Sequence, residues 1–117
     1  MQVLVVDDEV AIVELLAELL MDEGYQVHTA YDGRSALTVL QSEPYVAVVI
    51  SDIMMPGIDG WALYHALRAD PNRSSTGIVL MSAGHVPPAD LHDERAIFIG
   101  KPFSVADILN AIEHVSP

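Results

Sequence analysis

The chain has 117 residues, of which 51% are hydrophobic, and its mean hydropathy is +0.34. This length fits one compact domain, expected to span residues 1–117, that can bury a core without disulfides. The longest uninterrupted apolar run, Val46 to Ile50, is far shorter than the roughly 18 residues of a membrane-spanning helix. We therefore expect no membrane segment and no membrane partner.

The charge balance is strongly acidic, with 17 Asp and Glu residues against 5 Lys and Arg and a net charge of −12. Such a surface repels a phosphate backbone, and the basic residues form no cluster, so we expect no direct binding to nucleic acid. Excess acid can also serve solubility alone. The absence of cysteine excludes disulfides and zinc–thiolate sites and fits a cytoplasmic location.

The first part of the chain alternates between strand and helix patterns. Residues 3–6 form a β-branched run typical of a strand that is buried on both faces. Residues 9–22 have the spacing of an amphipathic helix, which Gly24 ends. Residues 25–29 are less apolar and predict a strand nearer an edge, and residues 34–41 predict a short helix. The first helix is expected to pack through Ile12, Leu15, Leu16, Leu19 and Leu20.

The second part repeats this alternation. Residues 46–50 are the strongest strand pattern and are predicted to lie at the centre of a sheet. Residues 61–69 predict a helix, and residues 78–81 and 97–99 predict two further strands. Ser104 is the predicted N-cap of the last helix. That helix is expected to pack through Val105, Ile108, Leu109 and Ile112.

Five strands that alternate with helices predict an α/β domain. The sheet should be parallel, with helices on both faces and right-handed crossovers. Between the last two strands, only residues 88–95 have a helical pattern, and Gly84, Pro87 and Pro88 precede or begin it. Because proline is tolerated in a first helical turn, we expect a fourth helix that is short or irregular, displaced or mobile.

Polar side chains follow four of the predicted strands. In an open parallel sheet, ligands bind beyond the carboxyl ends of the strands. The residues at these ends are Asp7, Asp8, Glu9, Ser51, Asp52, Ser82 and Lys101. Neighbouring carboxylates repel one another, and a divalent cation removes that penalty. Oxygen ligands without His or Cys favour Mg²⁺, with Mn²⁺ as the alternative.

Acids, a metal, a hydroxyl and a lysine together describe a phosphoryl-transfer site. The nucleophile should be a carboxylate, because the chain has no cysteine and no histidine follows these strands. Each signal taken singly has a plainer explanation: Asp7 to Glu9 suits the start of a helix, and Ser82 and Lys101 suit ordinary strand ends. Their combination at one sheet edge favours a site.

Four motifs in this order resemble the receiver domain family of two-component response regulators, of the chemotaxis-Y-like kind. They are VVDDE at 5–9, SDIMMPGIDG at 51–60, MSA at 81–83 and KPF at 101–103, and the resemblance covers essentially the whole chain. The second motif is highly specific, and the others gain weight from their order. The resemblance implies a flavodoxin-like sheet with strand order 2-1-3-4-5.

The resemblance also implies a role for each matching acid. Asp52 would be the phosphoacceptor and would face a bound Mg²⁺ ion. Asp8 would be a direct ligand of this ion, Asp7 would hold it through water, and the backbone carbonyl of Met54 would be a further ligand. The metal set would therefore be Asp7, Asp8, Asp52 and Met54.

The remaining motif residues would bind the phosphoryl group and respond to it. Ser82 would bind that group and move toward it on activation, and Lys101 would pair with its oxygens. Phe98 resembles the switch aromatic that turns inward when the hydroxyl moves, and without a tyrosine hydroxyl its switching would be steric. Pro56, Gly60 and Pro102 would shape the loops, Pro102 through a cis peptide bond.

The implied function is Mg²⁺-dependent acceptance of a phosphoryl group on Asp52 from a histidine kinase or phosphotransfer protein. The modified domain would switch a surface that a downstream protein or a fused output domain reads. No turnover of an external substrate is expected, so the chain would not be an enzyme. Met54 and Gly84 place no polar side chain beside the site, which predicts slow self-dephosphorylation.

The sequence leaves two alternatives to this function. A pseudo-receiver would use the fold only for protein–protein contact, and the altered fourth-helix region favours it, whereas the complete set of site residues argues against it. A phosphatase of the haloacid dehalogenase kind would need an acid two residues after its nucleophile and a cap domain. Met54 occupies that position, so this alternative is the weaker one.

Overall fold

The computed structural model describes residues 1–84 and 92–117. In these residues every predicted strand is present, together with four helices. The strands are β1 (Gln2–Val6), β2 (Gln26–Ala30), β3 (Val46–Asp52), β4 (Gly77–Ser82) and β5 (Ala96–Gly100). The helices are α1 (Val10–Asp22), α2 (Gly33–Ser42), α3 (Gly60–Ala69) and α4 (Val105–Val115).

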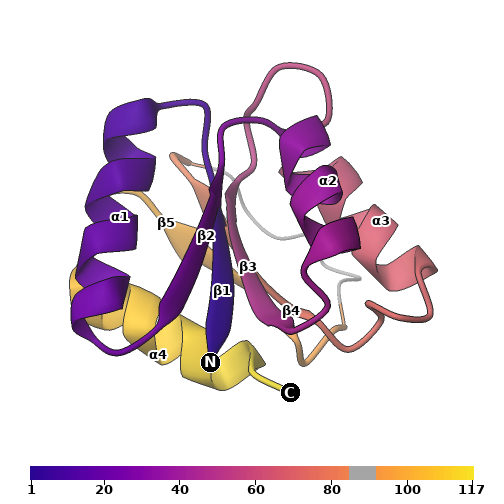
Figure 1. Cartoon of the computed structure of the whole chain (residues 1–117). Coiled ribbons are helices and arrows are strands. Elements are labelled where there is room, and N and C mark those ends of the chain that lie inside the picture. Colours follow the sequence, from indigo (N-terminus) through magenta and orange to yellow (C-terminus); the bar gives the residue numbers. More distant parts are fainter. Residues whose placement is uncertain (85–91) are drawn as a thin grey trace.

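The strands form one parallel sheet in the order β2-β1-β3-β4-β5. As predicted, β3 lies at its centre and β2 at an edge. Helices α1 and α4 cover one face, and α2 and α3 cover the other (Figure 1). The fold is therefore the doubly wound, flavodoxin-like arrangement, in which a central strand is buried from both sides.

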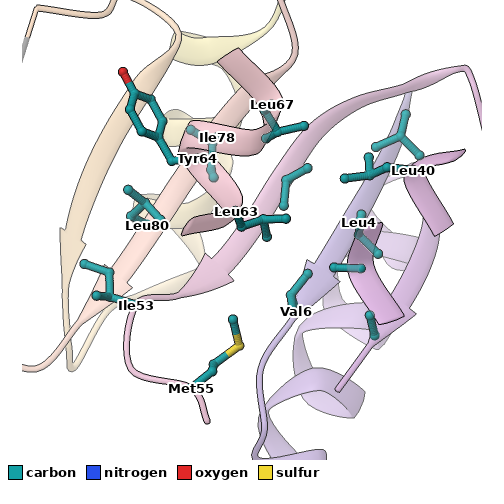
Figure 2. Close-up of a cluster of buried hydrophobic side chains, with 14 residues drawn as sticks. Leu4, Val6, Leu40, Ile53, Met55, Leu63, Tyr64, Leu67, Ile78 and Leu80 are labelled. Atoms are coloured by element: carbon teal, nitrogen blue, oxygen red, sulfur yellow. The ribbon is translucent and has the colours of Figure 1, made fainter. Parts of the chain in front are cut away.

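Both faces of β1 are covered, which explains its continuous apolar sequence. Val3 and Val5 belong to the core beneath α1 and α4. Leu4 and Val6 belong to the core beneath α2 and α3, and Figure 2 shows this second cluster, which includes Leu63 from α3. These four residues of β1 have no exposed surface, so the strand gives the site that follows it a rigid support.

The packing face of α1 differs from the prediction. Leu15 is 54% exposed, whereas Val13 is completely buried and forms one stripe with Leu16 and Leu20. Both stripes of this helix are apolar, so the spacing alone did not distinguish the core-facing one. The last helix shows the same effect, since Val105 is 39% exposed while the other core-facing positions are buried.

Two predicted helix ends are confirmed. Gly24 follows α1 with a φ of 92°, a left-handed conformation that glycine adopts without strain. Ser104 caps α4: its hydroxyl accepts a hydrogen bond from the Asp107 backbone N–H, and the Asp107 carboxylate accepts one from the Ser104 N–H. These two hydrogen bonds fix the start of α4, shortly after Lys101.

The first half of the predicted fourth helix, residues 88–91, lies outside the described residues, and so does Pro87. In the described part of this connection, residues 92–95 form a turn rather than a helix. None of the helices in the described ranges is long and apolar enough to cross a membrane.

Candidate functional site

The carboxyl ends of the strands bring the candidate residues to one edge of the sheet. Asp7 follows β1, Asp52 ends β3, Ser82 ends β4 and Lys101 follows β5. The connections after β1, β2 and β3 meet at the top of Figure 1. Residues far apart in the sequence therefore line one location, as the order of the strands predicts.

Three carboxylates form the acidic part of this site. Asp7, Asp8 and Asp52 each present an oxygen, and these oxygens lie within 4.8 Å of one another. Asp7 has no exposed surface and Asp52 is 8% exposed, whereas Asp8 is exposed. Such a set of hard oxygen ligands matches the preference of Mg²⁺.

Asp7 lies in an unfavourable place for a charge. Its Oδ1 accepts a hydrogen bond of 3.0 Å from the Glu9 backbone N–H, but its buried Oδ2 has no hydrogen-bond partner in the described part of the chain. Burial, together with the Asp52 charge, raises the Asp7 pKa, although the bond from Glu9 and the Lys101 charge lower it. A cation beside Oδ2 would relieve this penalty, so the residues present fit a bound metal ion.

Lys101 joins the two buried acids. Its Nζ lies 3.3 Å from Asp52 Oδ1 and 3.6 Å from Asp7 Oδ2, and its backbone N–H donates to the Ser82 carbonyl at 2.8 Å. Burial lowers the Lys101 pKa, but the Asp52 and Asp7 charges outweigh it, and the pKa is raised. The ammonium group therefore keeps its charge. The Lys101–Pro102 peptide bond is cis, as predicted.

The start of α3 holds the end of β3 in place. The Ile53 N–H donates to the Met81 carbonyl at 3.0 Å, and the Gly60 N–H donates to the Ile53 carbonyl at 2.9 Å. A Cβ at Gly60 would lie 2.6 Å from the Asp52 carbonyl oxygen, so a larger residue would displace the strand end that carries Asp52. This close approach gives the predicted loop-shaping role of Gly60 a physical reason.

The loop between β3 and α3 is open to solvent. The Met54 side chain, two residues after Asp52, is 64% exposed, and Pro56 is exposed as well. Asp59 ends the loop by accepting a hydrogen bond of 2.8 Å from the Ala62 N–H at the start of α3. The loop is thus fixed at both ends, and an apolar side chain borders the site between them.

Ser82 and Phe98 lie on neighbouring strands. Ser82 is 2% exposed at the end of β4, opposite Gly100 of β5. Phe98 is half-buried, packs on the core beneath α2 and α3, and has its ring centroid 5.3 Å from that of Trp61. The predicted switch aromatic therefore contacts α3, a contact that the sequence patterns did not reveal.

The sequence reasoning also missed a cavity beside the acids. It has a volume of about 520 Å³ and lies between the loops after β2 and β3. Its lining consists of Asp8, Tyr31, Asp32, Arg34, Pro56, Gly57 and Ile58. In the sequence the β2 loop carries no recognised motif, so no signal pointed to it.

The sequence pattern of the response regulator receiver domain matches residues 3–113. The chain belongs to this family. It is therefore a receiver domain of two-component signalling, the class of domain that interacts with histidine kinases and output domains and typically binds Mg²⁺ at an acidic pocket.

Individual relatives agree with this family. Transcriptional regulatory protein TcrA of Mycobacterium tuberculosis is 35% identical over 118 aligned positions, which cover 98% of this chain and 46% of that protein. Chemotaxis response regulator CheY4 of Vibrio cholerae superposes with a TM-score of 0.85 at 30% identity, with 97% of both chains covered. A receiver domain of a histidine kinase from Syntrophus aciditrophicus gives a TM-score of 0.82 at 27% identity, with 97% and 88% covered.

The receiver domain spans about half or less of the curated relatives TcrA and PleD, the latter a response regulator of Caulobacter vibrioides. The activities of those longer proteins that lie outside this domain are therefore not assigned to this chain.

Proposed function

We propose that this receiver domain accepts a phosphoryl group on Asp52 from a phosphohistidine of a histidine kinase or phosphotransfer protein. One observation carries the proposal. Three carboxylates present oxygens within 4.8 Å of one another, and the Nζ of Lys101 lies 3.3 Å from Asp52. A module used only for protein contact has no need for buried acids whose mutual repulsion requires a cation. The proposed domain comprises residues 1–117.

In the proposed reaction, the Asp52 carboxylate attacks the phosphorus atom. A bond forms between an Asp52 oxygen and phosphorus while the phosphorus–nitrogen bond breaks, and the imidazole nitrogen keeps the electron pair. Lys101 pairs with the phosphoryl oxygens, because its ammonium group already borders Asp52. The limited exposure of Asp52, 8%, keeps most water away from the acyl phosphate that results.

Asp7, Asp8, Asp52 and the backbone carbonyl of Met54 would hold Mg²⁺, and Mn²⁺ suits the same oxygen ligands. When bound, the metal neutralises negative charge on the phosphoryl oxygens and on the acids around them. The Oδ2 atom of Asp7 accepts no hydrogen bond from the described residues, which supports this assignment.

Ser82 and Phe98 would carry the signal outward. Ser82 would bind the phosphoryl group, and its movement would change the space available to Phe98, which lies on the adjacent strand. Because Phe98 contacts Trp61, the change would reach the surface of α3 as well as β5. A downstream protein or a fused output domain would read this surface.

Intact-mass spectrometry tests the proposal. The protein is incubated with Mg²⁺ and a small acyl-phosphate donor, and a gain of one phosphoryl group, about 80 Da, is expected. Asp52→Asn and a sample with chelated metal should show no gain. If the wild-type protein binds Mg²⁺ but gains no mass, the domain acts as a pseudo-receiver and the proposal is wrong.

A further inference from the structure

Four of the five basic side chains are engaged within the protein. Arg68 pairs with Asp93, Arg73 donates to three backbone carbonyls, Arg95 donates to the Ser116 carbonyl, and Lys101 lies between Asp7 and Asp52. Arg34 differs, because within residues 1–84 and 92–117 its guanidinium group forms no hydrogen bond and no ion pair. Among the Lys and Arg residues in the described ranges, Arg34 therefore remains available to a ligand, in a chain of net charge −12.

Arg34 lines the cavity of about 520 Å³ beside the acids. Asp8 belongs both to this cavity and to the cluster of three carboxylates, so the cavity opens onto the candidate metal site. Lys101 does not line it and instead borders a separate groove along α1. Arg34 and Lys101 therefore line different hollows, and the one that Arg34 lines shares Asp8 with the acidic cluster.

The walls of this cavity are held in place. A Cβ at Gly33 would overlap the carbonyl oxygen and side chain of Ile58, so the loops after β2 and β3 are in direct contact. Asp32 accepts a hydrogen bond of 2.7 Å from the Ser35 N–H, which caps α2 and is the main cause of its lowered pKa. The carboxylate nearest in sequence to Arg34 is thus occupied in fixing the helix.

We propose that this cavity receives the leaving group of a small acyl-phosphate donor. The leaving group is a carboxylate, and it pairs with Arg34. The proposal rests on phosphoryl acceptance at Asp52. In this transfer a bond forms between an Asp52 oxygen and phosphorus, and the bond between phosphorus and the acyl oxygen breaks. The electron pair stays on the departing carboxylate, so negative charge develops there and a nearby guanidinium stabilises it.

A donor with a phosphorus–nitrogen bond has a leaving group of different charge. When phosphoramidate that is protonated on nitrogen transfers its phosphoryl group, the phosphorus–nitrogen bond breaks, the nitrogen keeps the electron pair, and it leaves as neutral ammonia. Arg34 has nothing to stabilise on that leaving group. The residue should therefore favour acyl phosphates over phosphoramidate and also offset the repulsion that the acidic chain exerts on an anionic donor.

The test compares initial rates of phosphorylation with acetyl phosphate and with phosphoramidate at saturating Mg²⁺. Arg34→Gln should lower the acetyl phosphate rate by about threefold to tenfold and change the phosphoramidate rate by less than about twofold. Arg34→Lys, which keeps the charge, should restore most of the acetyl phosphate rate. Gln41→Glu on the exposed end of α2 is the matched control, because it and Arg34→Gln each change the net charge from −12 to −13.

The outcomes separate the possibilities. The proposal would be overturned if Arg34→Gln lowered the rates with both donors equally, or if Gln41→Glu lowered the acetyl phosphate rate as much as Arg34→Gln does. Either result would mean that Arg34 acts only through the overall electrostatic field of the protein. Unchanged rates in Arg34→Gln would overturn it as well. If the wild-type protein is phosphorylated by neither donor, the proposed function itself fails. Circular dichroism confirms that each variant is folded.

Discussion

Met54 lies two residues after Asp52, and its side chain bears on how fast phosphorylated Asp52 is hydrolysed. Its side chain is 64% exposed and offers no hydrogen bond to a water molecule that would attack the acyl phosphate. In phosphoryl-transfer sites a side-chain amide can orient such a water. The lifetime of phosphorylated Asp52 should therefore depend on this side chain.

We expect Met54→Gln to lose its phosphoryl group faster than the wild-type protein, on the order of threefold to tenfold, because orienting the water is worth about 1 kcal/mol. The measurement is the decay of the phosphorylated mass after the donor is removed. Met54→Leu, which stays apolar, is the control and should decay at the wild-type rate. A wild-type lifetime as short as that of Met54→Gln would contradict the expectation of slow self-dephosphorylation.

At the scale of elements, Arg73 connects α2 to the start of β3. Its guanidinium group donates to the carbonyls of Leu40, Glu43 and Val46 at 2.7, 2.5 and 2.8 Å, and the residue is only 6% exposed. Burial lowers its pKa, yet the guanidinium group stays charged and faces the negative end of the helix dipole. Arg73 thereby helps to set where the central strand begins.

Arg73→Met should lower the free energy of unfolding by about 3 kcal/mol, because it leaves three carbonyls without their donor. Urea unfolding monitored by circular dichroism measures this loss. Arg34→Met makes the same substitution and removes the same charge at an exposed position of α2. It should change stability by less than about 0.5 kcal/mol, and similar values for both variants would contradict the structural role of Arg73.

A second link between elements fixes the chain just before β5. Asp93 Oδ2 accepts hydrogen bonds from Arg68 Nε at 2.6 Å and from the Tyr64 hydroxyl at 2.8 Å, and Oδ1 accepts from the Arg95 N–H. Burial alone would raise the Asp93 pKa, but these donors, Arg68 first among them, outweigh it and the pKa is lowered. Arg68 also donates to the Thr76 and Arg95 carbonyls, so α3, β4 and β5 meet at this point.

The lowered pKa gives this link a pH dependence. A carboxyl whose folded-state pKa lies below its unfolded value of 3.8 stabilises the protein above that value and loses the effect as pH falls through the folded pKa. Asp93→Asn should therefore be less stable than the wild-type protein by about 1–2 kcal/mol near pH 6, and this difference should shrink as the pH falls below 3.8. Comparing the two proteins at each pH in urea removes the opposite contribution of Asp7, whose pKa is raised. A gap that does not depend on pH would contradict this assignment.

Across the whole molecule, the hydrophobic pattern predicted the strands more securely than the helix faces, and the resemblance to receiver domains implied the strand order that the structure has. Strands buried on both sides read as unbroken apolar runs, and the polar residues after them could be placed at one sheet edge by topology alone. In α1, Leu15 and Val13 are both apolar, so only tertiary packing decides which is buried. The cavity at Arg34 depends on contact between Gly33 at the start of α2 and Ile58 in the loop after β3, and no sequence pattern links these two positions.

The single tryptophan reports on coupling across the molecule. Trp61 on α3 contacts Phe98 on β5, whose strand lies beside the one that ends in Ser82. If phosphorylation moves Ser82 and then Phe98, the emission of Trp61 should change when acetyl phosphate and Mg²⁺ are added. Phe98→Leu should reduce that change while phosphorylation by mass persists. An unchanged spectrum in fully phosphorylated protein would show that the signal does not pass through this contact.

The central claim is that Asp52, and neither of the other two acids in its cluster, takes the phosphoryl group. Reduction with borohydride converts an aspartyl phosphate to homoserine, and tandem mass spectrometry of the digested protein locates it. We expect homoserine at position 52, and its formation should require both the donor and Mg²⁺. Homoserine at position 7 or 8, or none in a protein that has gained a phosphoryl mass, would contradict it.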